Sequence, residues 1–340
     1  MKNQRHVFAV CDLELSYACS FMEYMNRKRN IPFEVQAFTN VEALMEFGKN
    51  QEIEILLISD KAMCAEVKEL PAGQIVILSG GSQIPEMDEY PSVYKYQSSD
   101  SLIREVMALY AAKQEPLPVP ETVKRKTAVI GVYSPVGRSQ KTSFALTLGQ
   151  IMARERAVLY LNLEAYSGFE QLFETQYELG LSDLLYYIRQ ENTNLIHKMN
   201  AMVRSIQNLD YIPPAASATD LQNMDAQEWI RLLDEISRFS SYETVILDIG
   251  DAAGDVFPLL EACRRIYMPV RTDLISSAKI AQFENQLKAW GSQQVQERIR
   301  RLRLPYHNSP HSGKDYIEGL VWSELGDYVR QLLREEQVHL

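Results

Sequence analysis

The sequence has few cysteines and no long apolar segment. Its 340 residues include four cysteines, none of them in a C-x-x-C pair. This scarcity argues against a disulfide framework or a cysteine-rich zinc site, and it is typical of a reducing compartment. No apolar run approaches the roughly 18 residues of a membrane span, and the short run near Met1 ends at Asp12. We therefore expect a cytoplasmic protein without a signal peptide.

An excess of positive charge is also missing. Lys and Arg total 35 and Asp and Glu total 45, which gives a net charge of −10. An acidic chain is a poor dedicated binder of nucleic acid or anionic lipid, so we expect neither direct nucleic-acid binding nor direct membrane insertion. Hydrophobic residues make up 46% and charged residues 24%, which is typical of a globular protein.

Alternating prolines mark the boundary between two predicted domains. Pro116, Pro118 and Pro120 favour an extended segment that lacks the backbone donors of a helix or sheet. We predict a first domain over residues 1–113, a linker over 114–124 and a second domain over 125–340. In both domains short apolar runs alternate with helical patterns, which predicts an α/β fold with parallel sheets.

The expected strands follow from these apolar runs. They lie at residues 7–10, 33–38, 53–58, 74–78 and 93–96 in the first domain, and at 127–133, 157–163, 244–249, 266–270 and 301–304 in the second. Two helix starts show the spacing of a capping box, in which two side chains cap each other's backbone N–H. These pairs are Thr39 with Glu42, and Asp225 with Glu228.

The segment 128–152 carries the clearest chemical motif. A strand leads into the loop S-P-V-G-R-S-Q-K-T, and a helix follows at once. The free N–H groups of a helix N-terminus bind phosphate, Lys141 adds a positive charge there, and the Thr142 hydroxyl suits Mg²⁺. The pattern G-x-x-x-x-G-K-[ST] is incomplete, because Pro135 and Gln140 replace its glycines. The motif alone leaves open a Lys-Thr pair that merely begins a helix.

Two further predicted strands end in residues that suit the same site. The strand 244–249 carries Asp248, in the place of a carboxylate beside nucleotide-bound Mg²⁺. The strand 157–163 is followed by Glu164 and carries Asn162 near its end. Because ligands bind at the carboxyl edge of a parallel sheet, we expect these residues to converge on the loop.

With these motifs the chain resembles the deviant Walker A ATPases related to MinD and ParA, among them the pilus-assembly proteins TadZ and CpaE, and TadZ most closely. TadZ and CpaE join an atypical receiver domain, which has a flavodoxin-like fold, to a P-loop ATPase domain with a parallel sheet. The resemblance implies binding of ATP and Mg²⁺, a homodimer, and a role in localising the secretion apparatus of a tight-adherence (Tad, type IVb) pilus. Partners in that apparatus would concentrate the protein at a cell pole.

The family loop K-G-G-x-G-K-T falls on residues 136–142, and its signature lysine is replaced by Val136. Arg138 supplies a positive charge two residues on. Hydrolysis needs the charge of the signature lysine in the transition state and a positioned water molecule. Because that lysine is missing, we expect ATP binding with slow or no hydrolysis. The resemblance assigns catalysis to Lys141 and Glu164, Mg²⁺ binding to Thr142 and Asp248, and nucleotide binding to Gly137, Arg138, Ser139, Gln140, Lys141, Thr142, Ser143, Asp248, Pro305 and Tyr306.

The first domain resembles a receiver with reduced phosphorylation chemistry. Asp12 and Glu14 follow the first predicted strand, and Lys95 lies within the fifth. Asp60 ends the third strand one residue later than the usual phosphate acceptor, and Ser79 ends the fourth. We expect an adapter or dimerisation module, with phosphorylation of Asp60 as the alternative.

Three segments have a functional and a structural interpretation. The basic run 298–305 predicts an edge strand with a solvated face, with DNA contact as the alternative. The C-terminal helix after Leu320 is rich in acids and predicts packing on its own sheet instead of lipid binding. His307 and His311 flank Pro310 in a predicted polar loop, and the alternative is a metal site.

The alternative functions of the whole chain are a DNA-linked partition ATPase, a phospho-accepting response regulator, and a scaffold without nucleotide.

Overall fold

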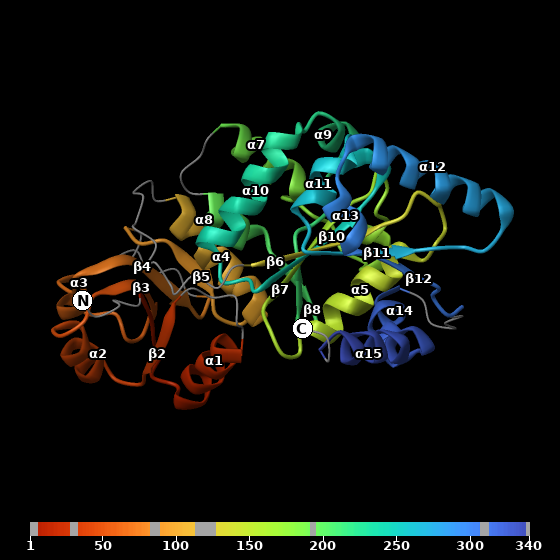
Figure 1. Cartoon of the computed structure of the whole chain (residues 1–340). Coiled ribbons are helices and arrows are strands. Elements are labelled where there is room, and N and C mark those ends of the chain that lie inside the picture. The colour runs from red at the N-terminus through yellow and green to blue at the C-terminus, as the bar shows by residue number, and fades with distance from the viewer. Residues whose placement is uncertain are drawn as a thin grey trace. The chain divides into compact units, whose positions relative to one another are not determined.

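The computed structural model describes residues 6–27, 33–81, 89–112, 127–190, 195–306 and 313–337. The chain divides into two compact units (Figure 1). The first comprises Met1–Lys124, Ile196–Ala201 and Phe239–Ser241, and the second comprises Arg125–Leu195, Met202–Arg238 and Tyr242–Leu340. The predicted linker and the segment 307–311 lie outside the described residues. Among those described, no helix combines the length and apolar character needed to cross a bilayer.

The first unit contains a five-stranded sheet in the order β2-β1-β3-β4-β5, with every pair parallel. This is the strand order of flavodoxin-like sheets. The strands are β1 (Val7–Cys11), β2 (Glu34–Phe38), β3 (Ile53–Ser59), β4 (Ala72–Ser79) and β5 (Ser92–Tyr94). The helices are α1 (Leu15–Arg27), α2 (Val41–Gly48), α3 (Ala65–Lys68) and α4 (Ser99–Ala112).

Helices cover both faces of this sheet, so its central strands are apolar on both sides. Phe8 and Val10 of β1 join a core cluster with residues of α1 and α4. Their neighbours Val7 and Ala9 point to the other face and join a second cluster with residues of α2 and α3. The continuous apolar runs of the sequence therefore correspond to strands buried on two sides.

The second unit contains a seven-stranded sheet in the order β12-β11-β6-β10-β7-β9-β8. The strands are β6 (Ala128–Tyr133), β7 (Val158–Leu163), β8 (Arg204–Ile206), β9 (Leu209–Tyr211), β10 (Thr244–Ile249), β11 (Arg265–Pro269) and β12 (Ile299–Leu302). All neighbours are parallel except β8 and β9. The sequence analysis missed β8 and β9, because each has only three residues and shows no alternation.

Helices pack on both faces of the second sheet as well. Figure 1 shows α5, α14 and α15 on one side of the central strands and α10, α11 and α12 on the other. The helices of the second unit are α5 (Lys141–Met152), α6 (Phe169–Leu172), α7 (Leu181–Arg189), α9 (Ala218–Gln222), α10 (Ala226–Phe239), α11 (Val256–Ala262), α12 (Leu274–Trp290), α13 (Gln293–Arg298), α14 (Gly313–Gly319) and α15 (Glu324–Gln337). Most of α8 (Leu195–Met202) belongs to the first unit.

The two predicted capping boxes had different outcomes. At the start of α10, Asp225 and Glu228 cap each other's backbone N–H groups at 2.7 and 2.8 Å, as predicted. The prediction for α2 was wrong. Asn40 is its N-cap, with a side-chain oxygen 2.8 Å from the backbone nitrogen of Ala43, and Thr39 precedes the cap. Asparagine caps a helix at least as well as threonine, so the N-cap is Asn40 and not the neighbouring Thr39.

Candidate nucleotide site

The loop between β6 and α5 holds two non-glycine residues in the left-handed backbone conformation. The angle φ is 55° at Arg138 and 62° at Gln140, which immediately precedes α5. A non-glycine residue pays about 1 kcal/mol or more for this conformation. Both positions align with glycines of the resembled loop. The turn therefore keeps the backbone of a glycine-rich loop without those glycines.

The side chains of this loop face different environments. Val136, at the place of the signature lysine, is only 6% exposed and packs inward. Ser139 is also buried, whereas Gly137 and Arg138 are exposed. A Cβ added at Gly137 would meet no atom within 4 Å. The loop thus presents backbone and one arginine to solvent, and open space lies beside Gly137.

Lys141 is held at the carboxyl edge of the sheet by three groups. Its Nζ lies 2.7 Å from Oε1 of Glu164 and 4.0 Å from Oδ1 of Asp248, and it donates to the carbonyl oxygen of Ile249. These partners come from the residue after β7 and from β10. The structure therefore brings Lys141, Glu164 and Asp248 together, although they are far apart in the sequence.

Thr142 and Ser143 begin α5 behind this lysine. The Ser143 hydroxyl lies 3.3 Å from the hydroxyl of Tyr316 on α14. Thr142 is half-buried, and its hydroxyl lowers the pKa of the Asp248 carboxyl.

Asp248 is fully buried, and this burial controls its charge. Burial raises the pKa of Asp248 to about 6, although Lys141 and the hydroxyls of Thr142 and Tyr160 lower it. Oδ2 accepts a hydrogen bond of 2.9 Å from the Tyr160 hydroxyl. Oδ1 has no hydrogen-bond partner among the described residues. One buried carboxylate oxygen is therefore left to a further ligand.

Tyr160 is a site residue that the sequence analysis missed. It lies on β7, and its buried hydroxyl also accepts a hydrogen bond of 2.9 Å from the Asn162 amide. The Asn162 carbonyl oxygen accepts from the backbone N–H of Glu164 at 3.0 Å. Burial and the neighbouring Asp248 raise the pKa of Tyr160 well above its usual value, so it stays a donor. A buried tyrosine two residues before Asn162 needs a polar partner, which was the available signal.

Gly250 allows β10 to approach the end of β7 closely. A Cβ at this position would lie 2.7 Å from the Leu163 carbonyl oxygen and 2.5 Å from Oε2 of Glu164. Real Cβ atoms do not approach backbone oxygens so closely, so a larger residue would displace the end of β7. The small residue keeps Glu164 within reach of Lys141.

The residues at this edge fit a magnesium ion that is also held by phosphate. Mg²⁺ in nucleotide sites is bound by one or two protein oxygens, with phosphates and water completing the octahedron. The free Oδ1 of buried Asp248 and the Thr142 hydroxyl suit that role. Within the described part of the chain, no three His, Cys, Asp or Glu side chains form a metal-binding group by themselves.

Pro305 and Tyr306 follow β12, two strands away from β6 in the sheet. Tyr306 is 77% exposed. Their assigned role as adenine contacts stays a prediction.

The basic run forms an edge strand with paired side chains. β12 lies at the edge of the second sheet, as predicted, but it begins at Ile299 and ends at Leu302. Arg300 pairs with Glu335 at 2.6 Å and with Glu336 at 3.2 Å, and Arg301 pairs with Glu284. Much of the charge of this run is therefore neutralised within the unit.

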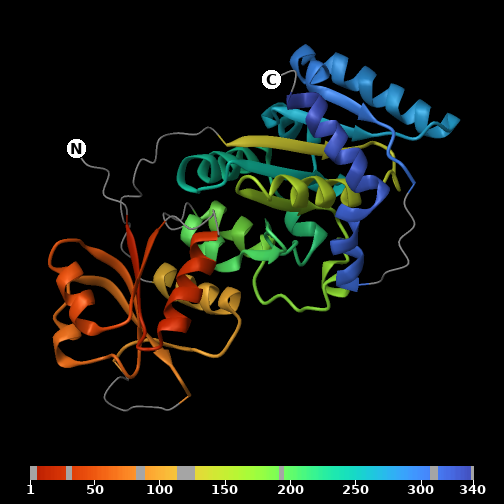
Figure 2. The ribbon, with the colours of Figure 1, turned by 90° about the horizontal axis from the view of Figure 1, so that it is seen from below.

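The C-terminal helix α15 buries its apolar face inside the second unit. Leu325, Val329 and Leu332 belong to the same core cluster as Leu148 and Met152 of α5. The prediction that this helix packs on its own sheet is confirmed in part, because the helix lies against α5 and its Glu336 accepts a hydrogen bond from the Tyr267 hydroxyl of β11. Both helices face the viewer in Figure 2.

In the first unit, Lys95 pairs with the acids that follow β1. Its Nζ lies 2.8 Å from Asp12 and 3.1 Å from Glu14. Burial opposes its charge, but the hydrogen bonds that it donates to both acids raise the pKa of Lys95. Lys95 follows β5 instead of lying within it.

Asp60 accepts hydrogen bonds from the Gly80 N–H at 3.2 Å and from the Ser59 hydroxyl at 3.4 Å. Phosphorylation of Asp60 stays a prediction.

Comparison with known proteins finds only remote structural similarity. No family model matches the sequence, and no curated protein matches it. A ParA family ATPase from Chlorobium tepidum TLS superposes with a TM-score of 0.43 at 19% identity, over 57% of this chain and 81% of that one.

Two further solved structures are similar at the same level. Cobyrinic acid a,c-diamide synthase from Mycobacterium smegmatis, with bound ATP analog and magnesium, has a TM-score of 0.40 at 16% identity, over 57% of this chain and 81% of that one. Apo McdA from Cyanthece has a TM-score of 0.42 at 15% identity, over 59% and 81%. Similarity this remote assigns neither a family nor a function to the chain.

Proposed function

We propose that the second unit binds ATP together with Mg²⁺ at the loop 134–142. The observation that carries this proposal is the buried Asp248 carboxylate, whose Oδ1 lacks a hydrogen-bond partner among the described residues and lies 4.0 Å from Nζ of Lys141. A buried carboxylate oxygen without a hydrogen bond is costly, and a divalent cation offsets that cost. The start of α5 directly behind the loop supplies N–H groups for phosphate.

Nucleotide binding requires Lys141 to change partners. The lysine must leave Glu164 and the Ile249 carbonyl to reach a phosphate oxygen. Glu164 is then released at the edge of the sheet, where its carboxylate can orient a water molecule. Bound Mg²⁺ supplies charge neutralisation at the β and γ phosphates. Asp248 and Thr142 would hold the ion.

We propose slow hydrolysis or none. Val136 is packed inward at the position of the signature lysine, and Arg138 lies on the exposed side of the loop. The charge that lysine provides in the transition state is therefore missing from its usual backbone position.

For the biological role, we propose a homodimeric factor that localises a pilus or secretion apparatus, as the resemblance to TadZ and CpaE implies. ATP binding would bias the dimer equilibrium, and the first unit would serve as an adapter or self-association module. The ion pairs of Arg300 and Arg301 favour this role over a DNA-linked partition ATPase, because they reduce the charge available to DNA phosphates.

Calorimetric titration with ATP, with and without Mg²⁺, tests the nucleotide site. We expect one site per chain, tighter binding with Mg²⁺, and a loss of tenfold or more in Lys141→Ala, because hydrogen bonds to charged groups contribute about 1.5–3 kcal/mol. The matched control is Lys279→Ala, which removes an exposed lysine from α12 and should bind like the natural chain. Absence of binding heat, together with a melting temperature unchanged by ATP, would overturn the proposal.

A further inference from the structure

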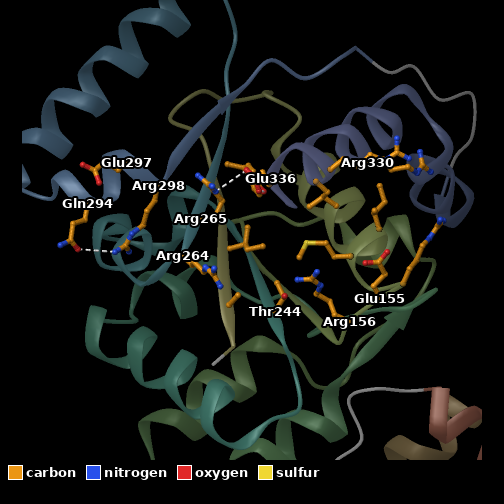
Figure 3. A pocket seen from close by; sticks show the side chains of 18 residues that line it. Glu155, Arg156, Thr244, Arg264, Arg265, Gln294, Glu297, Arg298, Arg330 and Glu336 are labelled. Carbon is orange, nitrogen blue, oxygen red and sulfur yellow. Dashed lines mark hydrogen bonds and ion pairs between the residues drawn. The ribbon is translucent and has the colours of Figure 1, made fainter. Parts of the chain in front are cut away.

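A cavity lies at the edge of the second sheet that is opposite to the loop 134–142. It has a volume of about 700 Å³ and is lined by the first residues of β6, β10 and β11, namely Ala128, Thr244 and Arg265. The end of α5 and parts of α13 and α15 complete its wall (Figure 3). Because the strands are parallel, this amino edge is separated from the loop 134–142 by the length of the sheet. The cavity is distinct from the proposed ATP site.

The cavity combines an apolar floor with a surplus of positive charge. Ile130, Met152 and Leu333 contribute apolar surface. Seven arginines line it, against three glutamates. A volume of this size holds a small molecule, for which pockets of about 300–1,000 Å³ are usual.

Four of the seven arginines have partners within the protein. Arg265 lies 3.4 Å from Glu336, and Arg330 lies 2.7 Å from Asp327. Arg298 donates to the carbonyl oxygens of Glu261 and Cys263. The guanidinium of Arg154 lies 5.2 Å from the Trp322 ring centre. These contacts hold the four arginine side chains in the wall of the cavity.

The other three arginines make no hydrogen bond or ion pair through their side chains to any described residue. They are Arg156 after α5, Arg264 before β11, and Arg334 on α15. Arg156 is half-buried, so its charge is partly withdrawn from water, whereas Arg264 and Arg334 are exposed. In the view of Figure 3, Thr244 lies between Arg264 and Arg156.

Thr244 adds an independent sign of a missing partner. It is 1% exposed, it lines the cavity, and its hydroxyl has no hydrogen-bond partner among the described residues. A buried hydroxyl without a partner costs about 1–3 kcal/mol. The half-buried charge of Arg156 in the same cavity also lacks a partner among the described residues. Such a combination lowers the stability of the protein and is typical of a site that is completed by a ligand.

We propose that this cavity binds a small organic phosphate ester with an apolar or aromatic body. Three unpaired guanidinium groups call for more than one negative charge. A phosphate monoester carries about −1.5 to −2 at neutral pH and has three acceptor oxygens, whereas a carboxylate carries one charge. Guanidinium groups match phosphate with paired hydrogen bonds. The floor around Ile130 and Met152 would contact the apolar body.

Phenyl phosphate, inorganic phosphate and benzoate are suitable probes for the full chain. Calorimetry should show one site for phenyl phosphate, with at least tenfold weaker binding of the other two. Arg156→Gln and Arg264→Gln should each weaken phenyl phosphate about tenfold, because each removes a charge-assisted contact. Lys141→Ala should leave this binding unchanged, since it lies at the other edge of the sheet. Arg238→Gln on α10 is the control for loss of an exposed arginine.

The stability of the variants without ligand provides a second measurement. Because Arg156 and Arg264 have no described partner, their neutralisation should leave the melting temperature unchanged or raise it. No detectable binding of phenyl phosphate would overturn the proposal. So would binding lost in Lys141→Ala and kept in Arg156→Gln, which would assign it to the loop 134–142. Equal affinity for benzoate would overturn the phosphate assignment, and equal affinity for inorganic phosphate would overturn the role of the apolar floor.

Discussion

Asp248 makes the stability of the second unit depend on pH. Its pKa is raised from 3.8 to about 6 in the folded protein, because burial penalises the charged form. The folded state therefore holds a proton more tightly than the unfolded chain does. Between these two values the free energy of unfolding falls as pH rises, and the full penalty applies above about pH 6.

Asp248→Asn should remove this penalty. We expect the metal-free variant to be more stable than the natural chain at pH 7, by on the order of 3 kcal/mol, and the difference to vanish near pH 4. Urea unfolding of both proteins at several pH values measures this difference in the free energy of unfolding. The other carboxylates are present in both proteins, so their contributions cancel. The variant should also lose the effect of Mg²⁺ on ATP affinity. A stability difference independent of pH would contradict the assigned pKa.

Two glycines of the site should respond differently to alanine. Gly137→Ala adds a Cβ that meets no atom within 4 Å, so stability should hardly change while ATP affinity falls. Gly250→Ala places a Cβ 2.7 Å from the Leu163 carbonyl oxygen, so we expect a loss of about 1–3 kcal/mol. Thermal unfolding and ATP titration of both variants check this. If ATP affinity is unchanged in Gly137→Ala, the space beside this residue is not a phosphate site.

At the scale of elements, the loop between β6 and α5 stores backbone strain. Arg138 and Gln140 adopt positive φ angles that glycine would adopt at little cost. The turn between β8 and β9 contains a comparable residue, Gln207, with a φ of 51°. Strain at Gln207 lies outside the proposed nucleotide site and so provides an internal comparison.

Gln140→Gly and Gln207→Gly should stabilise the protein by similar amounts. Relief of the left-handed conformation gains about 1–2 kcal/mol, and the added freedom of the unfolded chain takes back about half of it. Urea unfolding should show a net gain of about 0.5–1 kcal/mol for each. Only Gln140→Gly should change ATP affinity. A similar change of ATP affinity in both variants would mean that the conformation of Gln140 has no specific role in ATP binding.

The elements themselves were largely predictable, because their signals are local. The apolar run around Asp248 predicted a buried strand, and Asp225 with Glu228 predicted a helix start that the structure confirms. The failures were also local in origin. Asn40 competed with Thr39 for the same cap, and the short strands β8 and β9 lack a repeating pattern.

At the scale of the whole molecule, ATP should change the oligomeric state. A ligand shifts a dimer equilibrium only as far as it binds the dimer more tightly than the monomer. We expect ATP with Mg²⁺ to tighten dimerisation by at least tenfold in the natural chain and in Lys279→Ala, and to have no effect in Lys141→Ala. Sedimentation velocity over a range of protein concentrations measures this. Identical sedimentation with and without nucleotide would exclude the coupling.

The sequence by itself determined the order of the longer strands, the loop before Lys141, and the edge of the sheet at which Asp248 and Glu164 would meet. These follow from apolar periodicity and from the rule that parallel strands share one carboxyl edge. Only the tertiary structure decided which groups touch. It placed Tyr160 against Asp248, joined Lys141 to Glu164, and brought Arg156, Arg264 and Arg334 to one cavity without an ion pair to any residue in the described ranges. Burial and charge at a site depend on residues brought together from distant parts of the chain, and no local pattern encodes those distances.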